Sequence, residues 1–403
     1  MKYVIVGGSI AATTALNVIR ANNPDAEIQV IADEAVPFYY RALIPFLLDK
    51  SRTVDEILFT EQPTNDERVQ FHHDRCIGVN PKKKVIGLAS GGTLPYDKLL
   101  LAAGSSSFIP DIAGVDSKEV FTLRNMEEAL KVREHLKGCE NAVVVGGALA
   151  GIKMAEALQR TGVQVTVVEQ LPHILPFIAD TETAHRMSQQ LRQEGMEIHT
   201  NDSAEEILAA DGKTIGVRLA SGRTVPADLV LLMVGVQPNI EFLADSGIDI
   251  DQAVLTDREM QTSVPDIYAA GDMVQFHDAV IGKDVVSALW GNAVHMGRTA
   301  GFNMSGIKAF VPPLLSSLNS TEIAGLPIIS AGLLHTQSDQ YTAYAEAEGE
   351  NYRKLIFEQD RLVGMIFLGD VSKAGVYTNL IRHRIPLGDR RDALIHEVMT
   401  AIR

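Results

Sequence analysis

Two glycine-containing turns have the residue types and spacing that bind the pyrophosphate of a dinucleotide. The more regular one, in VVVGGALAGIKMAEAL, places Gly146, Ala148 and Gly151 in the pattern G-x-G-x-x-G. The first glycine of such a turn makes the bend after a strand, the second leaves room for the phosphates, and the third lets helix and strand pack closely. The free N–H groups of the following helix then face negative charge, so Leu149 is a further predicted contact.

A carboxylate stands where the ribose hydroxyls of such a nucleotide would need it. Glu169 ends the next apolar run, 23 residues after Gly146, and an acid at about 20 residues is part of the dinucleotide pattern. The residues that follow, Gln170, Leu171 and Pro172, offer no cation for a 2′-phosphate. The sequence therefore favours NAD(H) over NADP(H).

The other turn, VIVGGSIAATTAL, keeps only the first glycine, Gly7, because Ser9 and Ala12 take the other two positions. Alone, it fits a working nucleotide site, a decayed one or an ordinary strand-to-helix turn. An acid after the next strand, Asp33 or as the alternative Glu34, favours a working site. We expect the Ser9 hydroxyl to face phosphate and not the core. The predicted contacts are Gly7, Ser9, Ile10, Ala11 and Asp33.

The surrounding pattern predicts the elements that position these turns. Apolar runs predict strands at 3–6 and 27–32 around a helix at 9–22, and short hairpins at 71–104. The same order returns from residue 141, about 139 residues later, with hairpins at 205–233. From about residue 306 the pattern changes to strands, at 326–330 and around Asp360-Arg361, with a helical tail. The fold class is therefore α/β with a third, α+β segment.

Composition narrows the class of protein further. The 403 residues are 46% hydrophobic and 22% charged, which allows several globular cores, and the net charge of −15 argues against nucleic-acid binding. The cysteines, Cys76 and Cys139, stand 63 residues apart and form no disulfide framework or metal motif. We expect a cytoplasmic protein with no metal ligands and no membrane span.

Three further stretches stand in a specific order with the two turns: DKLLLAAGSSS (97–107), LMVGVQPN (232–239) and MQTSVPDIYAAGDM (260–273). With them the chain resembles the pyridine nucleotide-disulfide oxidoreductases, flavoproteins with two dinucleotide sites, and most of all rubredoxin reductases and the flavin module of NADH-dependent nitrite reductase. The resemblance implies two Rossmann-like three-layer domains. An FAD domain would comprise residues 1–109 and 236–305, an inserted NAD(H) domain residues 110–235, and a C-terminal interface domain residues 306–403.

The resemblance also implies individual roles around the flavin. Asp272 would hydrogen-bond the ribityl chain of FAD, and Arg41, in FYYRALIPFLL (38–48), would contact flavin or pyrophosphate unless it is a solvated surface arginine. The segment 289–306 would be a helix whose N-terminus faces the flavin, with Trp290 either walling the pocket or lying in the core. The remaining predicted cofactor contacts are Val79, Ala102, Ala103, Gly104, Gly235, Gly271, Asn292 and Ala293.

Two departures from the family matter for chemistry. No cysteine stands in 38–48, which disfavours dithiol exchange, peroxide reduction and coenzyme A disulfide reduction. We therefore predict no catalytic side chain. Lys153 replaces the family's usual glutamate; it would favour an anionic flavin, pair with a nearby carboxylate, or simply lie on the helix surface. The cluster Arg382–His383–Arg384 is interpreted as a solvated face.

These observations favour an FAD-dependent NADH:acceptor oxidoreductase that passes single electrons to an iron–sulfur protein such as rubredoxin. The alternative is a flavin subunit of a larger iron–sulfur or metal oxidoreductase, linking its redox centres to NAD(H) in either direction. A flavoprotein that reacts directly with oxygen is a weaker third possibility. The first would be a homodimer and the second part of a hetero-oligomer.

Overall fold

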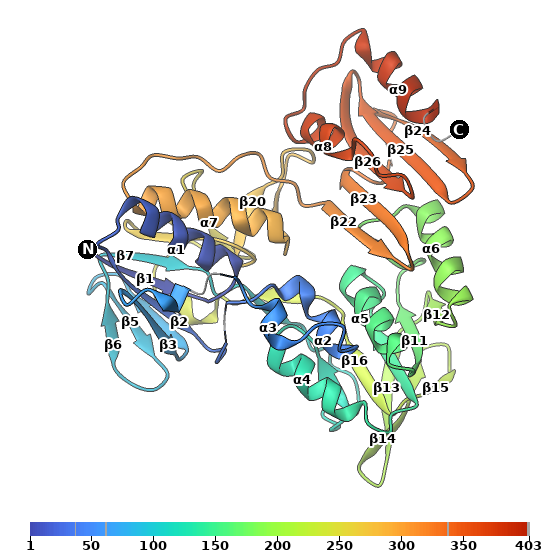
Figure 1. Ribbon diagram of the computed structural model, residues 1–403, viewed down its shortest axis with the longest axis horizontal. Coiled ribbons are helices and arrows are strands. Elements are labelled where there is room, and N and C mark those ends of the chain that lie inside the picture. The colour runs from blue at the N-terminus through green and yellow to red at the C-terminus, as the bar shows by residue number, and fades with distance from the viewer. Residues whose placement is uncertain (37, 61–62, 337, 401–403) are drawn as a thin grey trace.

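The computed structural model describes residues 1–36, 38–60, 63–336 and 338–400. Three lobes are visible in Figure 1: one holds both the N-terminal elements and α7 (Trp290–Met304), one the middle of the chain, and one the C-terminal elements. Among the described residues, no helix combines the length and apolar character needed to cross a membrane.

The first lobe is built on a parallel sheet. Its strands run in the order β19 (Ile267–Ala269), β7 (Lys98–Leu101), β1 (Lys2–Val6), β2 (Glu27–Ala32) and β3 (Val69–His73). Strand β19 joins the sheet after the chain has built the whole second lobe. That topology confirms the predicted insertion of one Rossmann-like domain into the other.

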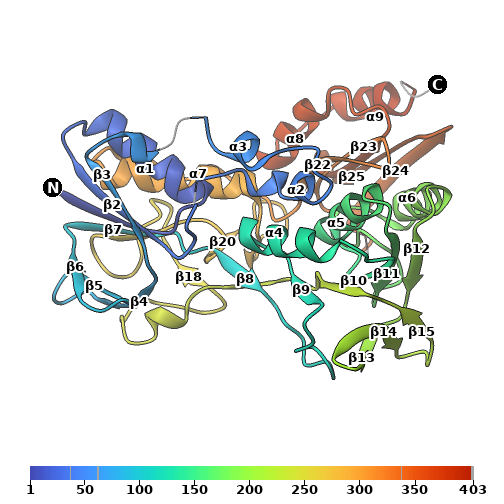
Figure 2. The same cartoon turned by 60° about the horizontal axis from the view of Figure 1, so that its bottom comes forward.

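Helix α1 (Ile10–Asn22) and α7 lie side by side on this sheet (Figures 1 and 2). Two glycines of α7 make the approach possible. A Cβ on Gly297 would stand 2.3 Å from the Ala11 carbonyl oxygen, and one on Gly301 would stand 2.8 Å from that of Ala15. The close packing fixes the N-terminal turn of α1, where the first glycine turn lies.

Antiparallel strands cover the rest of this lobe. One antiparallel sheet consists of β4 (Cys76–Asn80), β5 (Val85–Leu88) and β6 (Thr93–Pro95). A second, mixed sheet consists of β18 (Val254–Leu255), β20 (Val274–His277) and β21 (Asp284–Val286). In that sheet β20 and β21 are antiparallel, and β18 and β20 are parallel. The predicted hairpins at 71–104 are thus confirmed for β4–β6. The prediction is wrong at both ends of this range, since β3 and β7 belong to the parallel sheet, and the sequence of so short a strand carries no signal of its direction.

The second lobe repeats the plan. Its parallel sheet has the order β12 (Glu197–Thr200), β11 (Gln164–Glu169), β10 (Asn141–Val145), β16 (Leu229–Leu232) and β9 (Val120–Thr122). One face packs on α4 (Met126–His135), α5 (Leu149–Arg160) and α6 (Thr181–Gln193). The other packs on β13 (Ala204–Ala210), β14 (Lys213–Leu219) and β15 (Thr224–Pro226). The hairpins predicted at 205–233 end with β15, because β16 is a central parallel strand.

The chain crosses between these lobes twice, and the two crossings pair with each other. Strand β8 (Ser105–Ser107) runs antiparallel to β17 (Val236–Pro238). The short helices α2 (Pro45–Leu48) and α3 (Val54–Ile57) also reach across, since Leu47, Leu48 and Ile57 lie in the core of the second lobe. The domain boundaries at 109, 235 and 305 remain a prediction.

The third lobe is an antiparallel sheet with helices, as predicted. The strand order is β22 (Leu318–Ile323), β23 (Leu326–Gly332), β26 (Arg361–Leu368), β25 (Asn351–Glu358) and β24 (Tyr341–Glu348), with α8 (Ala374–Arg382) and α9 (Arg390–Thr400) packed on it. The β25–β26 turn is Gln359-Asp360, one residue before the predicted position. The fold class is confirmed.

Candidate dinucleotide sites

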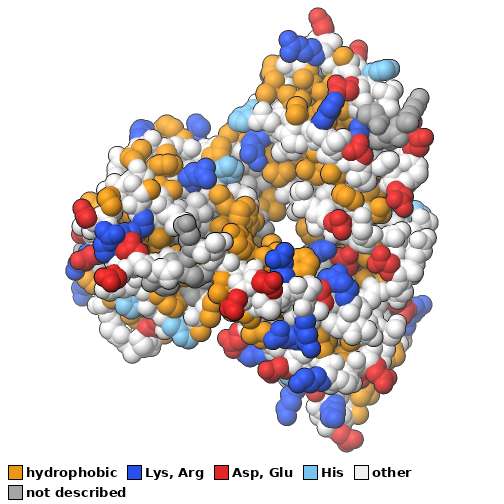
Figure 3. Space-filling model, viewed as in Figure 1, with side chains coloured by type: hydrophobic (Ala, Val, Ile, Leu, Met, Phe, Trp, Pro, Cys, Tyr) orange, Lys and Arg blue, Asp and Glu red, His pale blue; other side chains and the backbone are white. Residues whose placement is uncertain are grey.

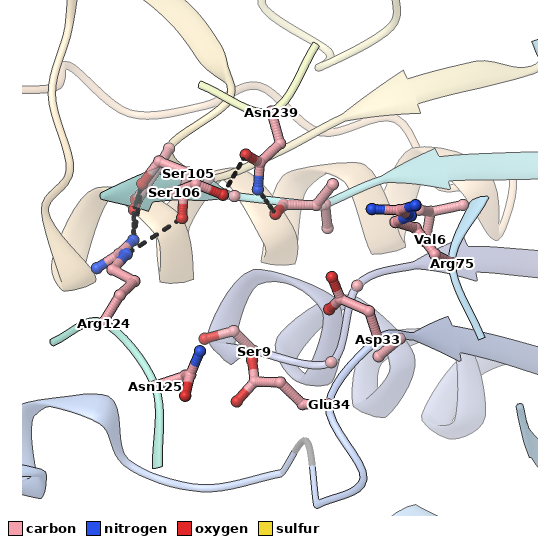
Figure 4. A pocket seen from close by; sticks show the side chains of 18 of the residues that line it. Val6, Ser9, Asp33, Glu34, Arg75, Ser105, Ser106, Arg124, Asn125 and Asn239 are labelled. Atoms are coloured by element: carbon pink, nitrogen blue, oxygen red, sulfur yellow. Dashed lines mark hydrogen bonds and ion pairs between the residues drawn. The ribbon is translucent and has the colours of Figure 1, made fainter. Parts of the chain in front are cut away.

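A cavity of about 740 Å³ opens beside the first glycine turn, a volume within the usual range of cofactor sites. Figure 4 shows polar side chains converging on it from several elements. Twelve of the predicted contacts line it: Gly7, Ser9, Ile10, Ala11, Asp33, Arg41, Ala102, Ala103, Gly104, Gly271, Asp272 and Ala293. They come from segments up to 286 residues apart. Most of them meet because they follow the ends of neighbouring strands of one sheet (β1, β2, β7 and β19), whereas Arg41 comes from a 3-10 turn and Ala293 from α7.

The N-terminal turn of α1 faces this cavity with free donors. Gly7 has φ +119°, and a Cβ there would stand 2.1 Å from the Ala102 carbonyl oxygen, so no other residue fits. The first intrahelical bond runs from the Thr13 N–H to the Ser9 carbonyl, and no side chain caps the helix. The N–H groups of Ile10 and Ala11 are therefore unpaired within the helix and available to a phosphate.

Arg41 lies across the mouth of this turn. Its Nε donates to the Ser9 hydroxyl at 3.1 Å, one Nη donates to the Arg124 carbonyl at 3.1 Å, and the other pairs with Glu34. The side chain is only 23% exposed, so the alternative of a solvated surface arginine does not hold. The Ser9 hydroxyl points toward this guanidinium at the cavity and not into the core.

The two acids after β2 have different surroundings. Glu34 accepts a hydrogen bond from the Tyr39 hydroxyl at 2.5 Å and pairs with Arg41. The Asp33 carboxylate, seen in Figure 4 pointing into the open space, has no partner among the described residues. A free carboxylate can accept two ribose hydroxyls, whereas an engaged one would first have to give up its partners. Asp33 is thus the better placed of the two.

At the far side of the cavity Asp272 is held by an arginine that the sequence did not reveal. The Ser105 hydroxyl donates to Asp272 at 3.0 Å, and Arg124 pairs with the same carboxylate oxygen while also donating to the Ser105 carbonyl at 3.2 Å. Asn125 caps α4 in a capping box with Glu128. The pattern N-x-x-E signals a helix start, and it could have placed Arg124 just before a helix N-terminus.

Four of the contacts predicted around the flavin lie outside the cavity lining: Val79, Trp290, Asn292 and Gly235, which is described below with the second glycine turn. Trp290 is 51% exposed, which makes its core alternative wrong; as the first residue of α7, it stands at the helix end and not on its packed face. The buried Asn292 amide donates to the Leu315 carbonyl at 2.9 Å. Val79 is buried in the core, and the earlier residues of β4, Cys76 and Ile77, line the cavity instead.

The second glycine turn has the same construction. Gly146 has φ +109°, and a Cβ on Gly151 would stand 2.0 Å from the Gly146 carbonyl oxygen. Ala148 precedes α5 without a side-chain cap, so the N–H groups of Leu149 and the next residues have no partner within the helix. Gly235 is an exposed hinge at φ +117° in the return crossing, and its carbonyl accepts a hydrogen bond from the Phe108 N–H.

Glu169 sits against this turn. Its carboxylate accepts hydrogen bonds from the Gly147 N–H at 2.7 Å and the Leu171 N–H at 2.8 Å, and it is buried. Each carboxylate oxygen keeps a second lone pair for a ribose hydroxyl. The acid thus holds the glycine turn in shape as well as standing where a ribose would lie.

Lys153 pairs with a nearby carboxylate, which was one of the three alternatives. Its ammonium donates to Glu156 at 2.6 Å and to the Glu322 carbonyl at 2.8 Å. The other Glu156 oxygen accepts from the Ala324 N–H at 2.8 Å. Lys153 does not line the cavity of the first lobe, and it links α5 to the β22–β23 hairpin of the third lobe.

Both turns meet the physical requirements of a dinucleotide. Each has a glycine at which a side chain would collide with the backbone, and a helix N-terminus with unpaired N–H groups. Each also has an acid at or just after the end of the next strand. The first site adds two arginines, Arg41 and Arg124, which are paired with Glu34 and Asp272 and keep further N–H donors that a pyrophosphate could accept. FAD would be held there by this chain, and NAD(H) at the second turn.

Comparison with known proteins gives an independent result. The family model described as "Pyridine nucleotide-disulphide oxidoreductase" matches residues 1–297, and that of the "Rubredoxin NAD+ reductase C-terminal domain" matches residues 318–385. The chain is similar to an NADH oxidase of Methanocaldococcus jannaschii, at 31% identity over 83% of this chain and 76% of that protein.

Two further relatives match over almost their whole length. The epsilon subunit of NADH-dependent phenylglyoxylate dehydrogenase of Aromatoleum evansii is 30% identical over 98% of this chain and 94% of that one. The NADH-rubredoxin oxidoreductase of Clostridium acetobutylicum is 26% identical over 92% of each.

A solved structure supports the fold over the full chain. The NAD-dependent persulfide reductase of A. fulgidus superposes with a TM-score of 0.92 at 26% identity, covering 100% of this chain and 83% of the other. The resemblance found in the sequence is therefore confirmed. This chain belongs to the pyridine nucleotide-disulphide oxidoreductase family, and it is a flavoprotein oxidoreductase with FAD and NAD(H) as its cofactors.

Proposed function

We propose that this protein takes hydride from NADH onto FAD and passes single electrons to an iron–sulfur protein, without a redox-active cysteine. When bound, FAD supplies the chemistry, since it accepts hydride and releases single electrons. The observation that carries the proposal is the absence of cysteine from the segment 38–48, which runs from the cavity toward the second lobe.

The two thiols present do not replace that missing group. Burial raises the pKa of Cys76 to about 11, and burial together with Asp228 raises that of Cys139 to about 11. Thiols with raised pKa values are poor nucleophiles at neutral pH. Since the chain offers no thiolate to relay electrons, the proposed route leads from flavin directly to an external acceptor.

The chain's own residues bind and orient in this proposal. The N–H groups after Gly7, with Arg41 and Arg124, hold the FAD pyrophosphate; Asp33 holds the adenosine ribose; and Asp272 meets the ribityl chain. Glu169 and the turn at Gly146 hold NADH. No side chain is required as an acid or base, because hydride transfer to flavin needs none from the protein.

A second candidate function is a flavin subunit of a larger oxidoreductase. It is favoured by one comparison, since the match to the phenylglyoxylate dehydrogenase epsilon subunit spans 98% of this chain and 94% of that protein. Such a subunit would exchange electrons with iron–sulfur subunits and link them to NAD(H) in either direction.

Purification under native conditions tests both candidates. A free yellow protein that bleaches anaerobically with NADH and reduces rubredoxin with high turnover supports the stand-alone enzyme. Co-purification with iron–sulfur polypeptides, together with little rubredoxin turnover, supports the subunit. A correctly folded protein that cannot be loaded with FAD contradicts both. Rapid NADH-driven oxygen consumption, without turnover on either carrier, would favour direct reaction with oxygen.

A further inference from the structure

We propose that the protein forms a two-fold symmetric homodimer through a surface at the C-terminal end of α7. This α7 C-terminal surface consists of Ile307 and Phe310, which follow the helix, and of Arg258, Glu259 and Lys308 around them. Such a dimer does not depend on the identity of the electron acceptor, so it goes beyond the proposed function. The family resemblance implied an interface within residues 306–403, and this surface takes only the first few of them, which lie on the first lobe.

The centre of this surface is apolar and exposed. Phe310 is 53% exposed and Ile307 is 43% exposed. Over the chain that leaves α7, Figure 3 shows hydrophobic side chains among those of Lys and Arg. Aromatic residues and arginine are enriched in protein interfaces. Covering these two side chains with a second copy would remove apolar area from water, which favours association.

Two cations lie against the Phe310 ring. The guanidinium carbon of Arg258 is 5.5 Å from the ring centroid, and the ammonium of Lys308 is 5.2 Å from it. Contacts of this length between a cation and an aromatic ring are attractive. The ring is therefore held in one orientation before a partner arrives, which lowers the ordering cost of binding.

A buried asparagine fixes the backbone that carries these side chains. The Asn303 amide nitrogen donates to the carbonyls of Glu259 and Ala309, at 2.9 and 2.8 Å, and its oxygen accepts from the Ala309 N–H at 3.1 Å. Asn303 is 6% exposed. The Val311 N–H also donates to the Arg258 carbonyl at 2.8 Å. The two segments of the surface therefore form one rigid unit.

The charges of this surface match those of a second copy. Lys308 pairs with Glu259 at 3.2 Å, whereas Arg258 is exposed and forms no ion pair with any described residue. Across a two-fold axis near Phe310, Arg258 of one copy can meet Glu259 of the other, and the contact occurs twice. The chain as a whole carries −15, so acidic faces of two copies repel each other. An apolar surface with balanced charges is thus the favourable place of contact.

Contact at this surface leaves the cavity of the first site open. Ala293, near the start of α7, lines the cavity, and α7 ends at Met304, roughly 16 Å further along the helix. Figure 1 shows the chain leaving this end of α7 on the side of the first lobe that faces away from the other two. Each copy in the dimer would therefore keep its route to an acceptor free of the other copy.

Sedimentation equilibrium of the FAD-loaded protein tests the dimer. The unaltered protein should be a dimer that dissociates on dilution. Phe310→Ala should raise the dimer dissociation constant at least about tenfold, because a few aromatic residues dominate such interfaces. The matched control is Phe177→Ala, which removes a phenylalanine that is 69% exposed on the second lobe; it should change the constant by less than about twofold. Equal flavin content per chain in all three proteins shows that each is folded.

A charge exchange tests the pairing across the axis. Arg258→Glu places two carboxylates against each other and should raise the dissociation constant at least about tenfold. Adding Glu259→Arg restores opposite charges in exchanged positions, so the double variant should recover most of the lost affinity. A double variant as weak as Arg258→Glu alone would contradict the pairing and with it the two-fold arrangement.

Three other results would overturn the proposal. One is a protein that stays monomeric at every concentration measured. Another is a dimer with the same dissociation constant in the unaltered protein, Phe310→Ala and Arg258→Glu, since its interface would then lie elsewhere. The third is binding of a monomeric protein to anionic phosphatidylglycerol vesicles that Phe310→Ala abolishes, which would assign the surface to a membrane.

Discussion

At the residue scale, polar groups in the first site divide into those already engaged and those left free. Asp272 is held by Ser105 and Arg124, and Glu34 by Arg41 and Tyr39. The Asp33 carboxylate and the first N–H groups of α1 have no partner in the described chain. Engaged groups hold the cavity in shape before a cofactor arrives, which lowers the ordering cost of binding, and free groups can accept or donate new hydrogen bonds without losing a partner.

Arg124 is expected to be a strong determinant of FAD affinity. Replacing it by methionine keeps the bulk of the side chain and removes its ion pair with Asp272 and its donation to Ser105. Hydrogen bonds of charged groups are worth about 1.5–3 kcal/mol, so the Kd for FAD should rise about tenfold to a hundredfold. Fluorescence titration of the apoprotein measures it. Arg361→Met, at an exposed position on β26, should bind FAD normally; an equal affinity in both variants would contradict this role.

Glu169 is expected to govern both NADH affinity and selectivity against NADPH. In Glu169→Gln the charge is lost but the volume stays, and the bonds from Gly147 and Leu171 weaken. The KM for NADH should rise about tenfold or more, and the NADH-to-NADPH ratio of kcat/KM should fall, because a carboxylate repels a 2′-phosphate. Glu197→Gln, whose side chain is 60% exposed, is the control. An unchanged ratio would show that Glu169 serves only the loop.

Some of these residues could be predicted from sequence, and others could not. Gly7, Gly146 and Gly151 were predictable because the reason for a glycine at each position is local. Gly7 and Gly146 allow the sharp bend after a strand, and Gly151 allows the helix to pack closely on that strand. Arg124 was not, since its partners Ser105 and Asp272 lie 19 and 148 residues away. Asn292 was predicted as a cofactor contact, yet it donates to Leu315 in the linker to the third lobe, a contact that no local pattern signals.

At the element scale, α7 fixes the glycine turn by packing against α1. The contact depends on Gly297 and Gly301, which lie on one face of α7 and let its backbone meet that of α1. The sequence pattern predicted a helix at 9–22, and the family resemblance implied another at 289–306; the structure places α1 and α7 there. The sequence could not predict their contact, because nothing in the pattern says which helix faces a small-residue stripe.

Gly297→Ala is expected to destabilise the protein and weaken FAD binding together. Its new Cβ would stand 2.3 Å from the backbone of Ala11, which lines the cavity, so α1 and α7 must separate. Overpacking of this kind costs about 1–3 kcal/mol. The free energy of unfolding from urea titration and the flavin content per chain measure the two effects. Gly375→Ala, in open space on α8, should instead be neutral or stabilising by up to about 1 kcal/mol; similar losses in both variants would contradict the packing argument.

At the scale of the whole molecule, the third lobe is docked on the second by buried polar contacts as well as by apolar side chains. Lys153 and Glu156 hold the β22–β23 hairpin, while Asp180, which caps α6, contacts β25. Ile323, Ile328 and Leu368 complete the apolar core that the two lobes share. The sequence predicted both lobes and their fold class. It gave no sign of this contact, because each of its polar residues reads separately as an ordinary surface charge.

Asp180 should therefore control the stability of the assembled chain in a pH-dependent way. Burial raises the pKa of Asp180, but hydrogen bonds from Lys354, Thr183 and Tyr352 outweigh it and hold the pKa below that of an ordinary aspartate. A carboxyl group whose folded pKa is lowered stabilises the protein above its unfolded pKa, and this stabilisation is lost as pH falls through the folded value. Asp180→Asn removes one partner of a buried pair with Lys354, which typically costs about 3–5 kcal/mol at neutral pH. Urea unfolding of both proteins from pH 7 downward measures the difference, which should be largest at pH 7 and shrink below about pH 4.

Asp389→Asn, at an exposed position of the third lobe, should cost little at any pH. A loss for Asp180→Asn that stays constant as the pH falls would mean that Asp180 acts by shape and not by charge.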